Sequence, residues 1–224
     1  KIFGGGTNIL PISGLELENG SDIFLSKLSA NGQQLTASTY LGGSGNDGVS
    51  TEANVKVKNY GDAFRGEVVV DQNENIIIVS STNSKNFPLK NAEQDSLAGR
   101  QDGVVAMFSS NLSQLLWSTY VGGDGYDALF SVKVNEQGVI YTTGITQSTN
   151  LPFPSNAYQT KLKGAEDGFV VKFVNQKVAS GTYLGTDKED GAYLVDLDKA
   201  GNVYVLGLSY GIYPVSNGVY SHPK

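Results

Sequence analysis

Two glycine-rich segments carry the residue types that bind calcium in proteins. The segments GGSGNDGVS (42–50) and GGDGYDALF (122–130) fit the nonapeptide G-G-x-G-x-D-x-U-x, in which U is apolar, with Asp47 and Asp127 as its carboxylates. Calcium prefers clustered carboxylate and carbonyl oxygens at about 2.4 Å. A calcium β-roll repeats the motif about every nine residues, whereas these copies lie 80 residues apart. We therefore expect tight glycine turns in which Asp47, Asp127 and Asp190 accept backbone hydrogen bonds, with a calcium site as the alternative.

The composition excludes several kinds of catalytic and binding site. The chain has 224 residues, no cysteine, a single histidine (His222) and a net charge of −6. Cysteine nucleophiles, thiolate metal sites and multi-histidine metal sites are therefore excluded. A serine–histidine–aspartate triad would have to use His222, which lies in a Ser-His-Pro-Lys tail. The negative charge argues against nucleic-acid binding, and no apolar run approaches the ~20 residues of a membrane span.

A repeated unit runs along the chain. Apolar segments led by Asp22, Asp102 and Asp167 each precede a polar turn and a second apolar run: LTASTYLGG, LLWSTYVGG and VASGTYLGT. An active site is normally unique, so we expect these three repeated aspartates to make structural hydrogen bonds rather than to catalyse. The first copy is longer because of an insertion near 49–59, where the alternation Val55-Lys-Val57-Lys predicts an extra strand or hairpin.

Each unit contains four short segments with the composition of β-strands. In the last units these segments are 192–197, 203–208, 167–173 and 180–185, and they are enriched in valine, isoleucine, tyrosine, phenylalanine and threonine. Polar turns such as Asp-Lys-Ala-Gly-Asn join the first two as a hairpin. No stretch shows a sustained helical period. The sequence therefore predicts an all-β fold of antiparallel strands.

Four-stranded units that cannot bury their faces alone indicate the blades of a β-propeller. The repeat divides the chain into a part-blade at 1–46, blades at 62–126 and 127–189, and a part-blade at 190–224. Propellers usually have about 4–8 blades, so the sequence predicts a partial propeller. We expect either that the chain belongs to something larger or that several copies form one ring.

The first strand of a propeller blade lines the central channel, and three charged residues occur there. These are Glu67, Lys133 and Asp196. Strand alternation places Lys133 and Ser131 on the face opposite Phe130, Val132 and Val134. Lys133 could therefore contact a ligand in the channel, although solvation of the channel is the simpler role.

The fourth strand, at the outer edge of a blade, carries recurrent aromatic residues. They are Tyr40, Trp117, Tyr120 and Tyr183. Aromatic rings at this edge either pack between blades, which we favour, or stack on sugars when exposed. Tyr40, Trp117 and Tyr120 are accordingly candidate ligand contacts.

The run DGFVVKF…STYVGGDGYD…VNEQGVIYTTGITQSTNLPFPSNAYQ resembles the bacterial β-propeller repeat called SBBP. The diagnostic pieces are Ser118-Thr-Tyr-Val-Gly-Gly123, the Gly-Asn or Gly-Val hairpin before the second strand, and a T-x-S-x-x-F/L-P connection. The resemblance covers nearly the whole chain, three times in register. Two departures are the insertion in the first copy and Gly185-Thr186, which replaces the Gly-Gly pair.

The resemblance implies a non-enzymatic scaffold or interaction module of a large secreted or surface-anchored bacterial protein. In Bacteroidetes-like bacteria such proteins are often cargo of the type IX secretion system, so protein partners, including translocon components of the outer membrane, are expected. The alternatives are a carbohydrate-binding adhesin and an enzyme whose site lies in blades outside this chain. No cofactor is expected apart from the calcium alternative. The segment Asp95-Ser96-Leu97 resembles Bacteroidetes O-glycosylation sites, with Ser96 as the acceptor.

Overall fold

The computed structural model describes residues 20–50 and 64–220. Within these ranges the chain forms twelve β-strands in four antiparallel sheets. The described part contains no helix that is long and apolar enough to cross a membrane. The predicted all-β, antiparallel fold is therefore confirmed.

Two four-stranded sheets lie in the middle of the molecule, and a two-stranded hairpin lies at each end. The first hairpin comprises β1 (Ile23–Leu28) and β2 (Leu35–Leu41). The first four-stranded sheet comprises β3 (Glu67–Val70), β4 (Ile76–Thr82), β5 (Asp102–Phe108) and β6 (Leu115–Val121). The second comprises β7 (Asp127–Val134), β8 (Ile140–Thr146), β9 (Asp167–Val174) and β10 (Lys177–Leu184). The last hairpin comprises β11 (Asp190–Leu197) and β12 (Val203–Ser209).

Each strand pairs with its neighbour in the chain, so both four-stranded sheets are simple meanders. Polar turn residues fix the hairpins. Asp71 accepts hydrogen bonds from the backbone amides of Asn73 and Asn75, and Asn135 does the same for Gln137 and Val139. Such Asx turns reverse the chain between the first and second strand of a sheet, as the sequence predicts.

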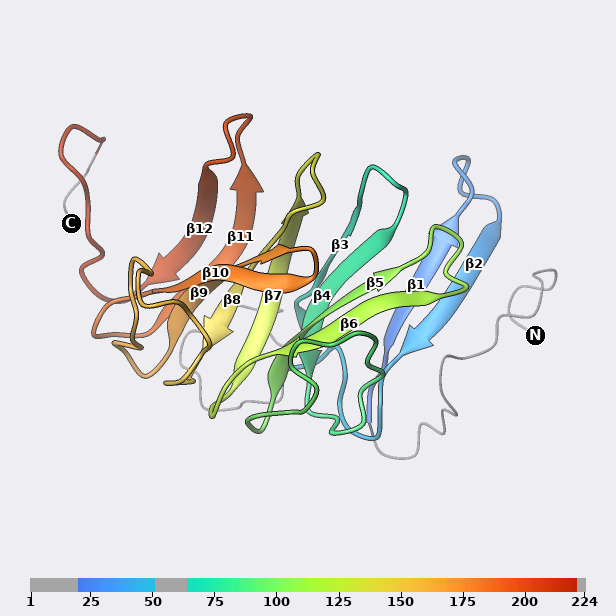
Figure 1. The fold of residues 1–224 in the computed structure, drawn as a ribbon, viewed down its shortest axis with the longest axis horizontal. Helices are drawn as coiled ribbons and strands as arrows, with labels where there is room; N and C mark the ends of the chain where they lie inside the picture. Colours follow the sequence, from blue (N-terminus) through green and yellow to red (C-terminus); the bar gives the residue numbers. More distant parts are fainter. Residues whose placement is uncertain (1–19, 51–63, 221–224) are drawn as a thin grey trace.

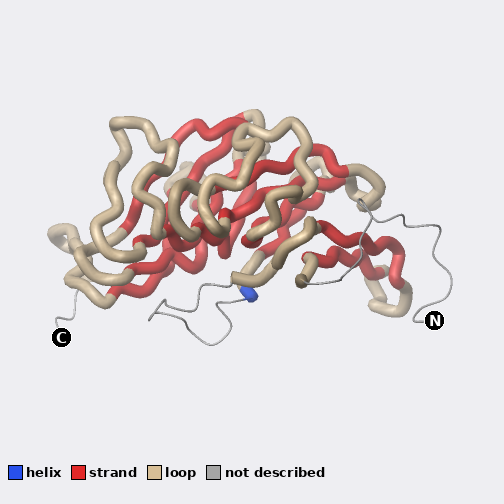
Figure 2. Tube along the Cα trace, turned by 90° about the horizontal axis from the view of Figure 1, so that it is seen from below, coloured by secondary structure: helices blue, strands red, loops and turns tan. Residues whose placement is uncertain are grey.

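The sheets follow one another across the molecule, from β1–β2 at one end to β11–β12 at the other (Figure 1). Apolar side chains fill the spaces between consecutive sheets. The largest cluster joins the two four-stranded sheets and includes Trp117, Leu129 and Phe169. A second cluster joins β1–β2 to the first four-stranded sheet, and a third joins β7 to β11. The view from below shows the same succession of strands, with long loops gathered along one side (Figure 2).

The strand alternation expected for β7 is wrong at one position. The register between β7 and β8 shifts between Leu129 and Ser131, which marks a β-bulge. Val132 packs in the cluster between the four-stranded sheets, whereas Phe130 stacks on Tyr193 of the last hairpin, with the ring centroids 5.7 Å apart. The extra residue of the bulge puts Phe130 and Val132 on different faces.

Some sequence predictions fall on residues outside the described ranges. The extra strand predicted around Val55–Lys58 is one of them, and so are most of the insertion at 49–59, the first part of the segment 1–46 and His222. The extra strand or hairpin around Val55–Lys58 therefore stays a prediction.

Candidate functional site

The carboxylate of Asp127 is held by the turn that joins β6 to β7. Its Oδ2 accepts hydrogen bonds from the Gly123 amide at 2.8 Å and from the Ser148 hydroxyl at 2.6 Å. Its Oδ1 accepts one from the Thr146 hydroxyl. Asp127 is buried, so these three donors replace the water that a carboxylate would otherwise bind.

Asp47 repeats the same arrangement after β2. The Gly43 amide and the Ser84 hydroxyl each donate to Oδ2 at 2.8 Å, and the Thr82 hydroxyl donates to Oδ1. The predicted role of Asp47 and Asp127 as acceptors in tight glycine turns is therefore confirmed.

The residues around Asp47 and Asp127 do not fit a calcium site. Calcium takes about six to eight oxygen ligands, but each junction brings together only two carboxylates, Asp22 with Asp47 or Asp102 with Asp127. The oxygens of Asp47 and Asp127 already accept protein hydrogen bonds. In the described ranges, no group of three or more acidic, histidine or cysteine side chains is placed to hold a metal ion. The hydroxyl and amide donors would have to turn away before a cation could bind.

Asp102 and Asp167, which begin β5 and β9, also make structural hydrogen bonds. Asp102 Oδ2 accepts from Gln94 Nε2 at 2.6 Å and from the Ala98 amide at 3.0 Å. Asp167 Oδ2 accepts in the same way from Gln159 Nε2 at 2.7 Å. The structural role predicted for the repeated acids is confirmed for Asp102 and Asp167. It stays a prediction for Asp22, whose Oδ2 is buried without a hydrogen-bond partner among the described residues.

Glutamine is the repeated partner that the sequence analysis missed. Gln94 and Gln159 each precede their aspartate by eight positions in the sequence. Oε1 of Gln94 accepts the Gly122 amide and Oε1 of Gln159 accepts the Gly185 amide, each at 3.0 Å. Each glutamine therefore links its connecting loop to the start of the third strand of the sheet and to the residue that follows the fourth. The repeated Gln-x₇-Asp spacing is the signal that would have revealed them.

Gly122 lies between two buried carboxylates. A Cβ at Gly122 would sit 2.5 Å from Asp102 Cγ and 2.8 Å from Asp127 Oδ2, so only glycine fits. Burial raises the pKa of Asp127 to about 7, opposed by its hydrogen-bond donors and reinforced by the Asp102 charge. Burial also raises the pKa of Asp102. Paired acids of this kind suit general acid–base chemistry, but here their oxygens are occupied by structural donors.

The third junction keeps the same hydrogen bond with different residues. Thr186 stands where Gly43 and Gly123 stand, and its hydroxyl donates to Asp190 Oδ2 at 2.8 Å. Gly211 stands where Ser148 supplies that hydroxyl, and a Cβ there would lie 2.0 Å from Thr186 Oγ1. At the second junction the hydroxyl that donates to the aspartate comes from Ser148, after β8, whereas at the third it comes from Thr186, before β11. This difference explains why Gly185-Thr186 departs from the Gly-Gly pair.

The outer-strand aromatics are packing residues. Trp117 is fully buried against Phe173 of the next sheet in an edge-on contact, with ring centroids 5.4 Å apart. Tyr120 is buried and donates its hydroxyl to the Ser84 carbonyl at 2.7 Å. The packing role that we favoured is thus confirmed for Trp117 and Tyr120, and the idea that their rings stack on a surface ligand is wrong. Tyr40, at the same position of β2, is 48% exposed.

Side chains link the first strands of successive sheets. Glu67 of β3 accepts hydrogen bonds from the Ser131 hydroxyl at 2.6 Å and the Val132 amide at 2.7 Å. The Ser131 oxygen in turn accepts the Val195 amide of β11 at 3.1 Å. Lys133 Nζ lies 4.0 Å from Glu67 Oε1 and remains partly exposed. Lys133 also lines an accessible cavity of about 480 Å³, together with residues of β11 and β12. A role of Lys133 in ligand binding stays a prediction.

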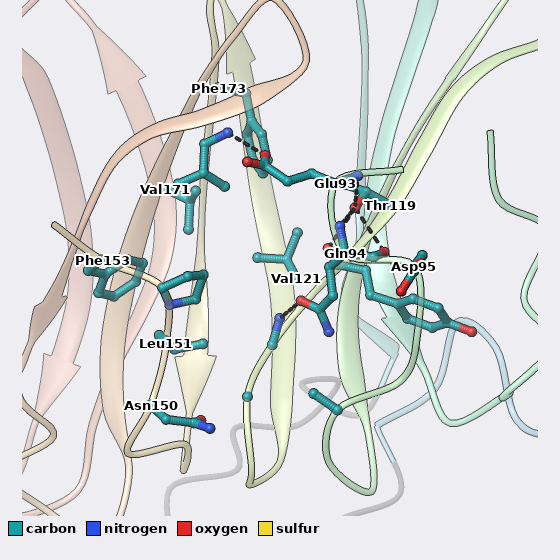
Figure 3. A pocket seen from close by; sticks show the side chains of 16 residues that line it. Glu93, Gln94, Asp95, Thr119, Val121, Asn150, Leu151, Phe153, Val171 and Phe173 are labelled. Carbon is teal, nitrogen blue, oxygen red and sulfur yellow. Dashed lines mark hydrogen bonds between the residues drawn. The ribbon is translucent and has the colours of Figure 1, made fainter. Parts of the chain in front are cut away.

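A second cavity of about 480 Å³ lies between the two four-stranded sheets (Figure 3). Its apolar wall includes Val121, Leu151, Phe153, Val171 and Phe173. Its acidic and amide groups come from the loop before β5 and from Asn150 (Figure 3). This cavity was not predicted, because its lining comes from segments far apart in the sequence.

Glu93 bridges the two sheets beside this cavity. Its Oε2 accepts the Val178 amide of β10 at 2.5 Å (Figure 3). Asp95 lies in the same loop and lines the cavity, and the next residue, Ser96, is exposed. The walls could enclose an apolar group, and the carboxylates could attract a cationic one. The lining includes no histidine or serine beside an acid, so it shows no nucleophile–base pair. Glycosylation of Ser96 stays a prediction.

The chain matches no model of a known protein family and no curated protein.

Proposed function

We propose that this chain is part of a β-propeller that acts as a non-enzymatic scaffold or interaction module. The propeller would belong to a larger secreted or surface-anchored bacterial protein, in keeping with the SBBP-like repeats. Cargo of a type IX secretion system is the specific form of this proposal, with outer-membrane translocon components among its partners.

The observation that carries the proposal is the repeated structural use of buried polar groups. Asp47, Asp127 and Asp190 sit at equivalent junctions, and each accepts a hydroxyl hydrogen bond. Apart from Asp190 Oδ1, which is buried without a hydrogen-bond partner among the described residues, the carboxylate oxygens of these three acids are engaged in structural hydrogen bonds at the junctions. Buried polar groups that recur at every junction favour a structural scaffold over an enzyme, because an active site normally occurs once in a molecule.

The arrangement of the first strands supports the propeller. Glu67 of β3 contacts β7, and Ser131 of β7 contacts β11, so these three strands are successive neighbours. In a propeller the first strands of successive blades lie side by side around the axis. Electron microscopy of the protein that contains this chain would test this. Four-stranded sheets arranged radially, with β3, β7 and β11 nearest the axis, are expected, and a stack of sheets without a common axis would contradict the propeller.

A substrate screen tests the non-enzymatic role. The purified chain would be incubated with glycoside, ester, phosphoester and peptide substrates. We expect no saturable turnover. Turnover that disappears in Lys133→Ala, or in Glu93→Gln beside the cavity between the sheets, would show that one of these cavities is an active site and would overturn the scaffold role.

A further inference from the structure

The cavity between the two four-stranded sheets is built entirely from the middle of the chain. All of its lining residues fall between positions 93 and 178, in the part that forms the two complete sheets. Its volume of about 480 Å³ is within the ~300–1,000 Å³ range of pockets that bind ligands. The cavity would therefore be kept when this chain forms part of a larger propeller.

Two acidic residues that line this cavity break the repeat. Glu93 and Asp95 lie in the loop before β5, whereas the equivalent positions of the loop before β9 are Tyr158 and Thr160, which carry no carboxylate. The glutamine between each pair recurs in both loops and makes the same hydrogen bond. Because the recurring residues hold the sheets together, the acids that do not recur are the candidates for a function of this one junction.

The Glu93 carboxylate is held beside the apolar wall by one of its two oxygens. Oε2 accepts the Val178 amide at 2.5 Å, so the side chain reaches from its own loop to the next sheet (Figure 3). Oε1 makes no hydrogen bond with the described residues, and neither Glu93 nor Asp95 forms an ion pair with a described lysine or arginine. The cavity thus presents a fixed negative charge that the described part of the chain does not neutralise.

An amide donor lies on the other side of the apolar wall. Asn150 Oδ1 accepts the Asp124 amide at 2.8 Å, and its Nδ2 makes no hydrogen bond with the described residues. Figure 3 shows Leu151 and Val171 between Asn150 and Glu93. A ligand that lies along this wall could therefore place a carbonyl oxygen at Asn150 and a cation at Glu93.

Lysine and arginine residues combine these features. Their aliphatic stems pack on apolar surface while the charged group stays at its edge, and their backbone supplies a carbonyl oxygen. We propose that the cavity binds a lysine or arginine side chain of a protein partner, with the stem on the apolar wall, the charge beside Glu93 and a peptide carbonyl at Asn150. The net charge of −6 would also attract a basic partner. The assignment rests on the proposed interaction module and names the chemistry that it recognises.

Titration of the isotopically labelled chain with blocked tripeptides, followed by NMR, tests the site. The probes are acetyl-Ala-Lys-Ala-amide, its arginine counterpart, and a norleucine counterpart that keeps the stem but lacks the charge. We expect saturable shifts of the Val121 and Val178 amides, with none at Gly138 in a distant exposed turn. Both basic probes should bind at least about tenfold more tightly than the norleucine probe. Equal binding of all three probes, or no saturation at about 10 mM, would overturn the proposal.

The variant Glu93→Gln separates the charge from the structural hydrogen bond. Glutamine keeps an oxygen that can accept the Val178 amide, so the free energy of unfolding should change little. Binding of the lysine probe should fall about tenfold, and binding of the norleucine probe should stay the same. The matched control Glu136→Gln removes the same charge at an exposed turn and should bind both probes as the unmodified chain does. Unchanged lysine binding in Glu93→Gln, or an equal loss in the control, would contradict the role of Glu93.

Two further ligands test the stem and the source of the cation. A diaminobutyrate residue in place of lysine shortens the stem by two methylenes and should weaken binding roughly tenfold. Free butylamine has the same stem and charge as lysine but no peptide carbonyl, and it should bind more weakly than the lysine probe. Butylamine that binds as tightly would indicate a site for free amines and would overturn the protein partner. A failure of every probe would overturn this site alone, whereas substrate turnover would overturn the non-enzymatic role.

Discussion

Asp127 is the residue whose charge state is tied most closely to the fold. It is buried, and Asp102 lies on the other side of Gly122. An unfolded aspartate has a pKa of about 3.9, whereas burial raises the pKa of Asp127 to about 7 in the folded chain. Below about pH 4 both states are protonated. As the pH rises from about 4 to about 7, the unfolded state loses its proton first, so the native state becomes less stable.

We therefore predict that the free energy of unfolding falls as the pH rises through this window. The contribution of Asp127 is at most about 4 kcal/mol. Asp127→Asn cannot ionise, so its stability should change less over the same window, even if the lost acceptor lowers stability at every pH. Urea unfolding at several pH values measures both curves. Parallel curves for the two proteins would show that Asp127 is ionised throughout.

A second prediction at the residue scale concerns the displaced hydroxyl of the third junction. Gly211→Ser alone should destabilise the chain by about 1–3 kcal/mol, since its Cβ would meet Thr186 Oγ1. Thr186→Gly alone removes the hydroxyl that donates to Asp190. The double variant recreates the pattern of the second junction and should recover most of the loss. A double-mutant cycle measures this coupling, and purely additive losses would contradict it.

At the scale of elements, Trp117 of β6 and Phe173 of β9 form a ring contact between the two four-stranded sheets. Trp117→Ala should cost about 3–5 kcal/mol, because it empties the space beside Phe173. Trp117→Phe should cost much less, since the buried indole N–H has no hydrogen-bond partner to lose. Trp117 is the only tryptophan, so circular dichroism is the appropriate readout of unfolding. Similar losses in both variants would show that the ring contact is not what stabilises this interface.

The strands and turns were predictable from the sequence because their signals are local. The predicted segments 167–173 and 203–208 lie within β9 and β12, and the polar hairpin turns match the Asx turns found. The bulge in β7 was not predictable, because counting alternate residues assumes a constant period of two. The cavity between the sheets was missed for another reason: it depends on contacts between loops and strands of different repeats. The glutamine partner of Asp102 is local, eight positions away, and was missed because the repeated Gln-x₇-Asp spacing went unread.

At the scale of the whole molecule, each sheet within residues 20–50 and 64–220 packs only on its neighbours, so among these residues the two end hairpins are supported on one side. In such arrays stability falls towards unsupported ends. We predict faster amide hydrogen exchange in β1 and β12 than in β5 and β8. Exchange measured by mass spectrometry at low protein concentration tests this order. Equal protection in all four sheets would indicate a single cooperative unit.

The exchange between Thr186 and Gly211 bears on how such repeats are recognised from sequence. Two positions change their residue type, while the physical interaction between them persists. A comparison that scores each position independently counts two mismatches there, although the hydroxyl-to-aspartate hydrogen bond is kept. The divergence between the repeats of this molecule is therefore better judged from pairs of contacting positions than from single positions. Sequence searches for similar repeats should give weight to such compensating pairs.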